Sequence, residues 1–186
     1  MGGFWYPGAA TKPLVELLRE YEDSVGHNSN YLLELSPDPQ GRISAADRSA
    51  YSAFGQALVR CYTGAAAVRQ EIGNRTGMVF ELAAATTAVD RVLFAEDLQK
   101  CGQRVTSYTV SVLLPDNTTW QSAGSGESVG HCRIQRITPV PPGTRIRLTA
   151  TALAVVSGAD CASSTASLRR LASFDMAGCM ADILPV

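Results

Sequence analysis

Tyr31-Leu-Leu-Glu-Leu-Ser36 is a short, largely apolar run that is followed by a turn signal, Pro37-Asp-Pro-Gln-Gly41. Its length and composition predict a strand that is covered on both faces, and its proline, aspartate and glycine residues predict the turn. A helical pattern stands on each side of the run. A buried strand between amphipathic helices is typical of a parallel α/β fold. We therefore expect this strand to pair with strands that the chain itself does not supply.

The helix before the run is predicted over residues 13–24. Thr11 is expected to cap it, Pro13 suits its first turn, and Gly26 suits its end. The apolar residues at helical spacing are Leu14, Leu17, Leu18, Tyr21 and Val25. The acidic residues Glu16, Glu20, Glu22 and Asp23 are predicted to form the solvated face of the helix.

The helix after the run begins with Ser44 and Asp47, which are spaced as in a capping box. One side of this helix is apolar and carries Tyr51, Phe54, Leu58 and Cys61. Residues 13–62 are therefore predicted to form helix, strand and helix, in that order.

The second half of the chain has the pattern of an antiparallel sheet protein. Strands are predicted at Met78–Leu82, Arg91–Ala95, Ser107–Leu114 and Arg145–Ala152. The third strand places Tyr108, Val110, Val112 and Leu114 on one face, and the fourth alternates in the same way. A turn at residues 115–117 leads to a return strand that carries Trp120, which we expect in the core. Strands with one polar face, separated by turns, favour a β-sandwich.

Composition excludes several classes of function. The chain has 186 residues, of which 46% are hydrophobic and 18% charged, with a net charge of −1. This indicates a globular protein with no basic surface for nucleic acid, and no apolar run is long enough to span a membrane. The five cysteines show no metal or redox spacing, and at least one stands outside any intrachain disulfide. The N-terminal residues lack the pattern of a signal peptide.

Two glycosylation triplets and two histidines bear on modification and on metal binding. Asn74-Arg75-Thr76 and Asn117-Thr118-Thr119 permit N-glycosylation if the protein enters a secretory pathway. His27 and His131 are the only histidines, and neither has a cysteine or carboxylate at metal-ligand spacing. We expect neither a metal nor a cofactor.

Three blocks of sequence, in order, resemble the α-L-fucosidases of glycoside hydrolase family 29, in the form that carries a C-terminal β-sandwich. They are Gly3-Phe-Trp-Tyr-Pro7 with the helix after it, the stretch from Ser24 to Ile43, and the positions 102–108, 120–121, 124–126 and 129–134. The chain departs from the family pattern at three positions. Phe4 stands in place of a tryptophan, His27 in place of an arginine and Glu34 in place of an asparagine.

The resemblance implies an α+β chain in three parts. Residues 1–63 would form the C-terminal end of a (β/α)8 TIM-type barrel, as helix, strand and helix. Residues 64–76 would be a shortened linker. Residues 77–186 would form a galactose-binding-like antiparallel β-sandwich that lacks its first strand region.

The resemblance also implies a function, the removal of terminal α-L-fucose from fucosylated glycans by a retaining exo-glycosidase. No catalytic residue is expected in this chain, because the family's two carboxylates come from barrel segments that would precede Met1. Phe4, Trp5 and Tyr6 are the expected substrate-binding residues, since aromatic faces pack on sugar rings. Glu34 is interpreted as a strand-end residue and Asp38 as a turn former. Relatives are usually secreted, lysosomal or periplasmic, and this N-terminus carries no address.

Two other interpretations stay open. The chain could be a carbohydrate-binding module that uses loop aromatics of the sandwich. It could also be a degenerate non-enzyme in which the family's tail persists without activity. The sequence leaves the oligomeric state open.

Overall fold

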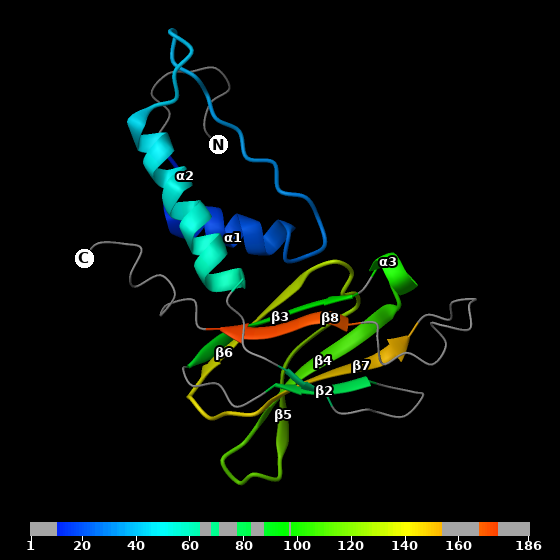
Figure 1. Ribbon diagram of the computed structural model, residues 1–186. Helices are drawn as coiled ribbons and strands as arrows, with labels where there is room; N and C mark the ends of the chain where they lie inside the picture. The colour runs from blue at the N-terminus through cyan, green and yellow to red at the C-terminus, as the bar shows by residue number, and fades with distance from the viewer. Residues whose placement is uncertain are drawn as a thin grey trace.

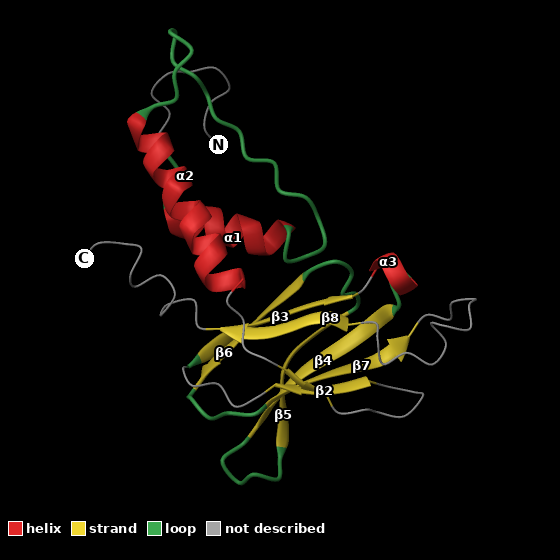
Figure 2. Ribbon diagram, in the orientation of Figure 1, coloured by secondary structure: helices red, strands yellow, loops and turns green. Residues whose placement is uncertain are grey.

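The computed structural model describes residues 11–63, 68–70, 78–82, 88–96, 98–153 and 168–174. In these residues the fold is α+β, as expected, with two long helices and two antiparallel sheets. Figure 1 shows three layers, in which the helices lie on a small sheet and the small sheet lies on a larger one. Figure 2 shows the same division by secondary structure. No helix in the described ranges is long and apolar enough to cross a membrane.

The helical layer contains α1 (Leu14–Ser24) and α2 (Ala45–Ala57), and α2 continues as a π-helical turn, Leu58–Thr63. The predicted cap at Ser44 is confirmed, because the Ser44 hydroxyl accepts a hydrogen bond from the Asp47 backbone amide at 3.0 Å. The Asp47 carboxylate accepts from the same hydroxyl at 2.7 Å, and not from the Ser44 backbone amide as in a full capping box. The predicted cap of α1 is wrong. Pro13 is the residue that precedes the helix, and the Thr11 hydroxyl instead donates to the Asp47 carboxylate at 2.8 Å. Thr11 therefore links the start of α1 to the start of α2.

The larger sheet has five strands in the order β1-β2-β7-β4-β5, and the smaller has three in the order β6-β3-β8. The strands of the larger sheet are β1 (Val68–Gln70), β2 (Met78–Leu82), β4 (Val105–Leu113), β5 (Trp120–Gly126) and β7 (Ile146–Leu153). Those of the smaller sheet are β3 (Val89–Glu96), β6 (Arg133–Val140) and β8 (Leu168–Phe174), and a short helix, α3 (Leu98–Cys101), follows β3. β1 lies inside the segment expected to be a linker.

The main core lies between the two sheets. The inward face of β4 carries Tyr108, Val110 and Val112, and that of β7 carries Ile146, Leu148 and Ala150. This alternation confirms the pattern predicted for both strands. Phe94 of β3 meets Tyr108 edge-to-face, with ring centroids 4.9 Å apart. Such aromatic pairs add to the burial of apolar area that holds the sheets together.

The smaller sheet is covered on both faces. Val92 and Phe94 of β3 point into the main core, whereas Leu93 between them packs in a second cluster with the helices. Ile137 and Ile134 of β6 divide in the same way. The helices contribute Leu14, Leu17, Leu18, Phe54, Ala57, Cys61 and Tyr62 to this second cluster. The smaller sheet is thus the middle layer of the molecule.

Glu22 is not on a solvated face, and that prediction is wrong. Its side chain is only 3% exposed and lies between two arginines of the middle sheet. The Glu22 carboxylate accepts from Arg91 Nε at 2.8 Å and from Arg136 Nε at 2.6 Å. The Tyr62 hydroxyl donates to the same carboxylate at 3.0 Å. Glu22 therefore joins α1 and the turn after α2 to two strands of the middle sheet, β3 and β6.

Residues 31–36 do not form a strand in this structure, contrary to the prediction. They run extended from α1 toward α2, and no described strand pairs with them. Leu32 is 83% exposed. A strand is an arrangement of paired backbones, so an extended segment without a neighbour is not one.

One further expectation is wrong, and another holds for a different reason. α1 ends before Gly26, as predicted, with Val25 as its C-cap residue, but the positive φ angle falls on Asn28 and not on Gly26. A side chain at Gly26 would come within 2.9 Å of Ile134 Cβ, so glycine is needed there to let β6 approach the helix. Trp120 is not in the core. It lies half-buried on the outer face of the larger sheet, with the Arg147 guanidinium 3.8 Å above its ring.

The substitution Glu22→Gln tests the buried contact. It removes the charge that lies between the guanidinium groups of Arg91 and Arg136 and leaves each arginine with a single aspartate partner. We therefore expect the free energy of unfolding to fall by about 2–4 kcal/mol. Glu16→Gln on the exposed side of the same helix is the matched control, with an expected change within about 0.5 kcal/mol. Urea denaturation followed by circular dichroism measures both. Equal effects of the two variants would show that Glu22 does not hold the layers together.

Candidate functional site

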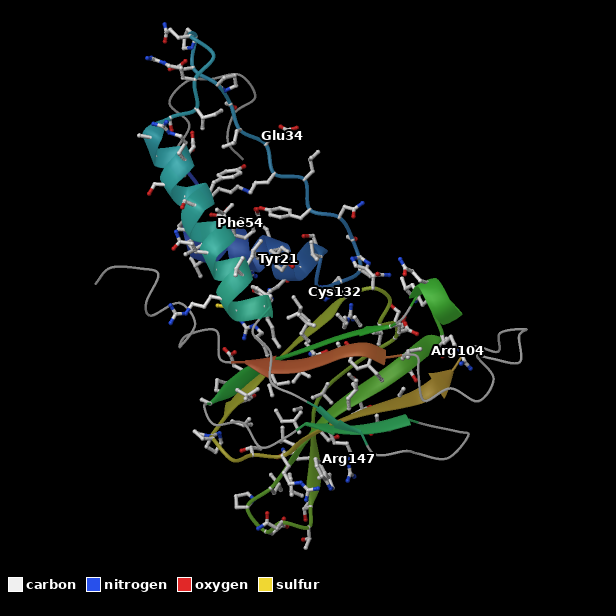
Figure 3. All side chains as sticks on the ribbon, viewed as in Figure 1. Tyr21, Glu34, Phe54, Arg104, Cys132 and Arg147 are labelled. Carbon is white, nitrogen blue, oxygen red and sulfur yellow. The ribbon has the colours of Figure 1, made fainter. Side chains whose placement is uncertain are left out.

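The expected substrate-binding residues, Phe4, Trp5 and Tyr6, lie outside the described residues. The described part of the candidate site is the surface formed by residues 29–42 against α1 and α2. Figure 3 shows Tyr21 and Phe54 between the helices, whereas Glu34 lies on the extended segment, apart from them. The site is therefore built from this segment and the groups that fix its two ends.

Alternate side chains hold the extended segment to the helices. Tyr31 and Leu33 pack on the second cluster, and the Tyr31 ring meets Phe54 edge-to-face at 6.2 Å. The Tyr31 hydroxyl donates to Glu20 Oε2 at 2.6 Å, and Lys12 pairs with the other oxygen of Glu20. These two donors favour the charged carboxylate, Lys12 more than Tyr31, and so lower the pKa of Glu20. Burial and the nearby Glu20 raise the pKa of Tyr31.

The other side of the segment is open to solvent and carries Leu32, which is 83% exposed. Leu35 follows three residues later, so it lies on the same side as Tyr31 and Leu33, and it is 37% exposed. The Glu34 side chain is exposed, and the backbone carbonyl of this residue accepts a hydrogen bond from the Tyr51 hydroxyl at 3.2 Å. The alternation of packed and open side chains is that of a strand with one face satisfied and one face bare.

Asp38 forms the turn after the segment, as predicted. Its Oδ1 accepts from the backbone amides of Gln40 at 2.9 Å and Arg42 at 2.8 Å, and its Oδ2 accepts from Arg42 Nε at 2.9 Å. These donors, with the Arg42 amide first, lower the pKa of Asp38. Both oxygens of Asp38 therefore take part in the turn.

The start of the segment is clamped by the loop that precedes β6. The Ile134 amide donates to the Gly26 carbonyl at 2.9 Å, and the His131 amide donates to Asn28 Oδ1 at 2.9 Å. Asn28 has a φ angle of +68° and lies directly against Gly130, where a Cβ would come within 2.3 Å of Asn28 Nδ2. His27 and His131 thus take part in the contact between the helical part and the sheets.

A second buried carboxylate, Glu96, fixes that loop. Glu96 is 2% exposed, and its Oε2 accepts from the Gly130 amide at 2.8 Å. Its Oε1 accepts from the amides of Arg104 at 2.7 Å and Val105 at 2.8 Å. A carboxylate that accepts several backbone donors is a strong structural tie. The sequence reasoning missed Glu96, whose only signal is its place at the end of an apolar strand.

Of four carboxylates that bear on this site or on its supports, three hold structure together. Glu22 and Glu96 are enclosed by their donors, Asp38 closes a turn, and Glu34 is exposed. No group of three or more histidine, cysteine or acidic residues that could hold a metal occurs in the part of the chain that the structure describes. The arrangement holds the extended segment at both ends, and one side of this segment is exposed to solvent.

Comparison with known proteins bears on what that face contacts. No family model matches the chain. The chain is 24% identical over 177 residues to α-L-fucosidase 1 of Arabidopsis thaliana, and the match covers 79% of this chain and 35% of that protein. The chain thus spans about a third of the curated relative's length.

Solved structures give the same picture. A Bacteroides thetaiotaomicron protein named as a candidate α-L-fucosidase is 26% identical, with a TM-score of 0.69. The match covers 88% of this chain and 34% of that protein. A glycoside hydrolase 29 family member from an unknown rumen bacterium is 24% identical, with a TM-score of 0.71, and here the match covers 93% of this chain and 31% of that protein. The resemblance stated from the sequence is confirmed: the chain is similar, over most of its length, to about a third of these proteins.

Gly130→Ala tests the clamp. A Cβ at Gly130 meets the Asn28 side chain and must adopt a φ angle of +65°, so the variant loses both favourable backbone geometry and the Asn28–His131 contact. Gly143→Ala is the matched control, because its φ angle is +84° and no atom lies within 4 Å of its Cβ. We expect about 1–2 kcal/mol of destabilisation in the control and at least about 1 kcal/mol more in Gly130→Ala.

Thermal or urea unfolding gives the comparison, and amide NMR shifts of residues 26–31 report whether the segment has come loose. If the two variants lose the same stability and residues 26–31 keep their shifts, the loop does not position the segment.

Proposed function

We propose that this chain is the C-terminal part of an α-L-fucosidase, a retaining exo-glycosidase that releases terminal α-L-fucose from glycans, and that this part is inactive alone. The observation that carries the proposal is the match to α-L-fucosidase 1 over 79% of the chain and 35% of that protein. The function would thus belong to a larger unit, of which these residues form one end.

The fold of the larger unit is part of the proposal. Residues 1–63 would be the end of a (β/α)8 barrel, residues 64–76 a shortened linker, and residues 77–186 a galactose-binding-like β-sandwich. The exposed side chains of Leu32 and Leu35 support this, because they lie on opposite sides of an extended backbone and so suit a strand that neighbours would cover on both sides. In a barrel the turn that contains Asp38 would then lie at the face that carries active sites.

The proposed chemistry requires a pair of carboxyl groups. Retention uses two carboxyl groups about 5–5.5 Å apart, one as nucleophile and one as acid and base. The carboxylates described above serve structural roles, so the catalytic pair is assigned to barrel strands that precede Met1. Phe4, Trp5 and Tyr6 are proposed to contribute aromatic contacts to the fucose ring.

The alternative of a carbohydrate-binding module gains no support from Trp120. An aromatic platform needs an open ring face, and here the guanidinium group of Arg147 lies 3.8 Å from the centre of the Trp120 ring. A stacked guanidinium is a stable arrangement that a sugar would have to displace. A non-enzyme remains the interpretation that the activity test below decides.

Leu32→Glu tests whether the bare face is covered in a larger protein. In the 186-residue chain Leu32 is 83% exposed, so we expect no loss of stability and less self-association, measured by light scattering against concentration. In a complete enzyme the same substitution places a charge in the barrel and should destabilise it by several kcal/mol. Val15→Glu, at an apolar position of α1 that is 66% exposed, serves as the control. A neutral Leu32→Glu in the complete protein would contradict the barrel.

Activity tests the function. The transcript is sequenced upstream of Met1, and the longest open frame is expressed beside the 186-residue chain. We expect the longer protein to hydrolyse 4-nitrophenyl α-L-fucoside with retention and the short chain to give none above buffer. Trp5→Ala in the longer protein should lower kcat/KM about 2–10-fold through a higher KM, as loss of one aromatic contact implies.

Trp120→Phe, on the outer face of the sheet, is the aromatic control and should leave kcat/KM unchanged. A stop codon directly upstream, or a longer protein without hydrolysis, would favour the non-enzyme. Glycan-array binding by the short chain would favour the module.

A further inference from the structure

The turn between β4 and β5 displays an exposed asparagine. The backbone amide of Asn117 donates to the Leu114 carbonyl at 2.9 Å. The backbone amide of Leu114 donates to the Thr119 carbonyl at 2.9 Å, which closes the hairpin. Asn117 has a φ angle of +56°, and residues 115–119 are all exposed. Asparagine is one of the few residues that adopt this backbone region readily.

The turn is held by Asp116 rather than by Asn117. Asp116 Oδ1 accepts from the Thr118 amide at 3.0 Å and from the Thr119 amide at 2.9 Å. The Thr119 hydroxyl, then the two amides, lower the pKa of Asp116 to about 2. Among the described residues, none of the hydrogen bonds that hold the turn uses the Asn117 side chain. That side chain can therefore carry a substituent without loss of the turn.

We propose that Asn117 is an acceptor for an N-linked glycan when the chain passes through a secretory pathway. Asn117-Thr118-Thr119 is a complete acceptor triplet with threonine at the third position and no proline. In the transfer, the side-chain amide nitrogen of Asn117 bonds to the anomeric carbon of a lipid-diphosphate-linked oligosaccharide. The bond from that carbon to the diphosphate breaks, and the amide proton leaves with the lipid diphosphate.

The position gives the glycan a physical role. β5 is the last strand of the larger sheet, and its outer edge has no strand partner among the described residues. Open sheet edges promote pairing between chains, and proteins protect them in several ways. A glycan at Asn117 would stand in the turn three residues before β5, at the end of this edge, and would hinder such pairing. The proposal does not depend on the fucosidase function, because it rests on this hairpin alone.

The test uses the full 186-residue chain with a cleavable secretory leader, expressed in cultured eukaryotic cells. Trypsin releases residues 105–133 as one peptide, in which Asn117 is the only asparagine. Peptide N-glycosidase in ¹⁸O-water should convert the glycosylated peptide to one with a labelled aspartate at position 117. The intact glycosylated protein should migrate faster in gel electrophoresis after the same treatment, because the glycan has been removed.

Three variants separate the motif from the fold. Asn117→Gly keeps the positive φ angle without strain, so it should lose the modification and keep the midpoint of unfolding. Thr119→Ala should also lose the modification, and Thr119→Ser should retain it. Secreted chain whose 105–133 peptide carries no glycan, while a co-expressed reference glycoprotein is glycosylated, would overturn the proposal.

Discussion

A carboxylate between two arginines joins the helices to the sheets. Arg91 and Arg136 are directly opposed on neighbouring strands of the middle sheet, and like charges in that register repel. Glu22 Oε1 and Oε2 each take one of them, at 2.8 and 2.6 Å, while Asp90 and Asp23 take the outer nitrogens. The carboxylate on the helix thus offsets the repulsion between the two arginines, and the arginines neutralise a carboxylate that is buried. Burial of Tyr62 beside Glu22 raises the pKa of the phenol, so the hydroxyl stays a donor to this carboxylate.

The same contact shows where sequence reasoning succeeds and where it fails. Strands β4 and β7 were predicted correctly because one of their faces is buried and the other polar, which gives a clean alternation. Glu22 was assigned to solvent because it is charged. Its spacing indicated otherwise, since it follows Leu14 and Leu18 at intervals of four residues and so continues the buried face of α1. A charge on an apolar stripe signals a buried partner, and the partners here lie 69 and 114 residues away.

Strands of the middle sheet do not show the alternation of apolar and polar residues, because both faces of this sheet are covered. β6 sends Ile137 to one core and Ile134 to the other, with arginines and a glutamine among them, so no single face is apolar. The segment at residues 31–36 fails in the opposite direction. Its apolar pattern predicts a buried strand, but a strand depends on neighbours, and the described chain offers it only the helices on one side. Of the candidate site, Asp38 was predicted from its turn chemistry, whereas the clamp at Asn28 depends on tertiary contact alone.

These features together assign a role to the sheets. Glu96 fixes the loop that contains Gly130, that loop holds Asn28, and Asn28 stands three residues before Tyr31. The extended segment is therefore positioned by a rigid double-sheet body through backbone amides, which vary little with side-chain motion. Sites on such supported elements keep their geometry better than sites on loops. The sheets thus act as a scaffold that sets the place of residues 29–36 relative to the helices.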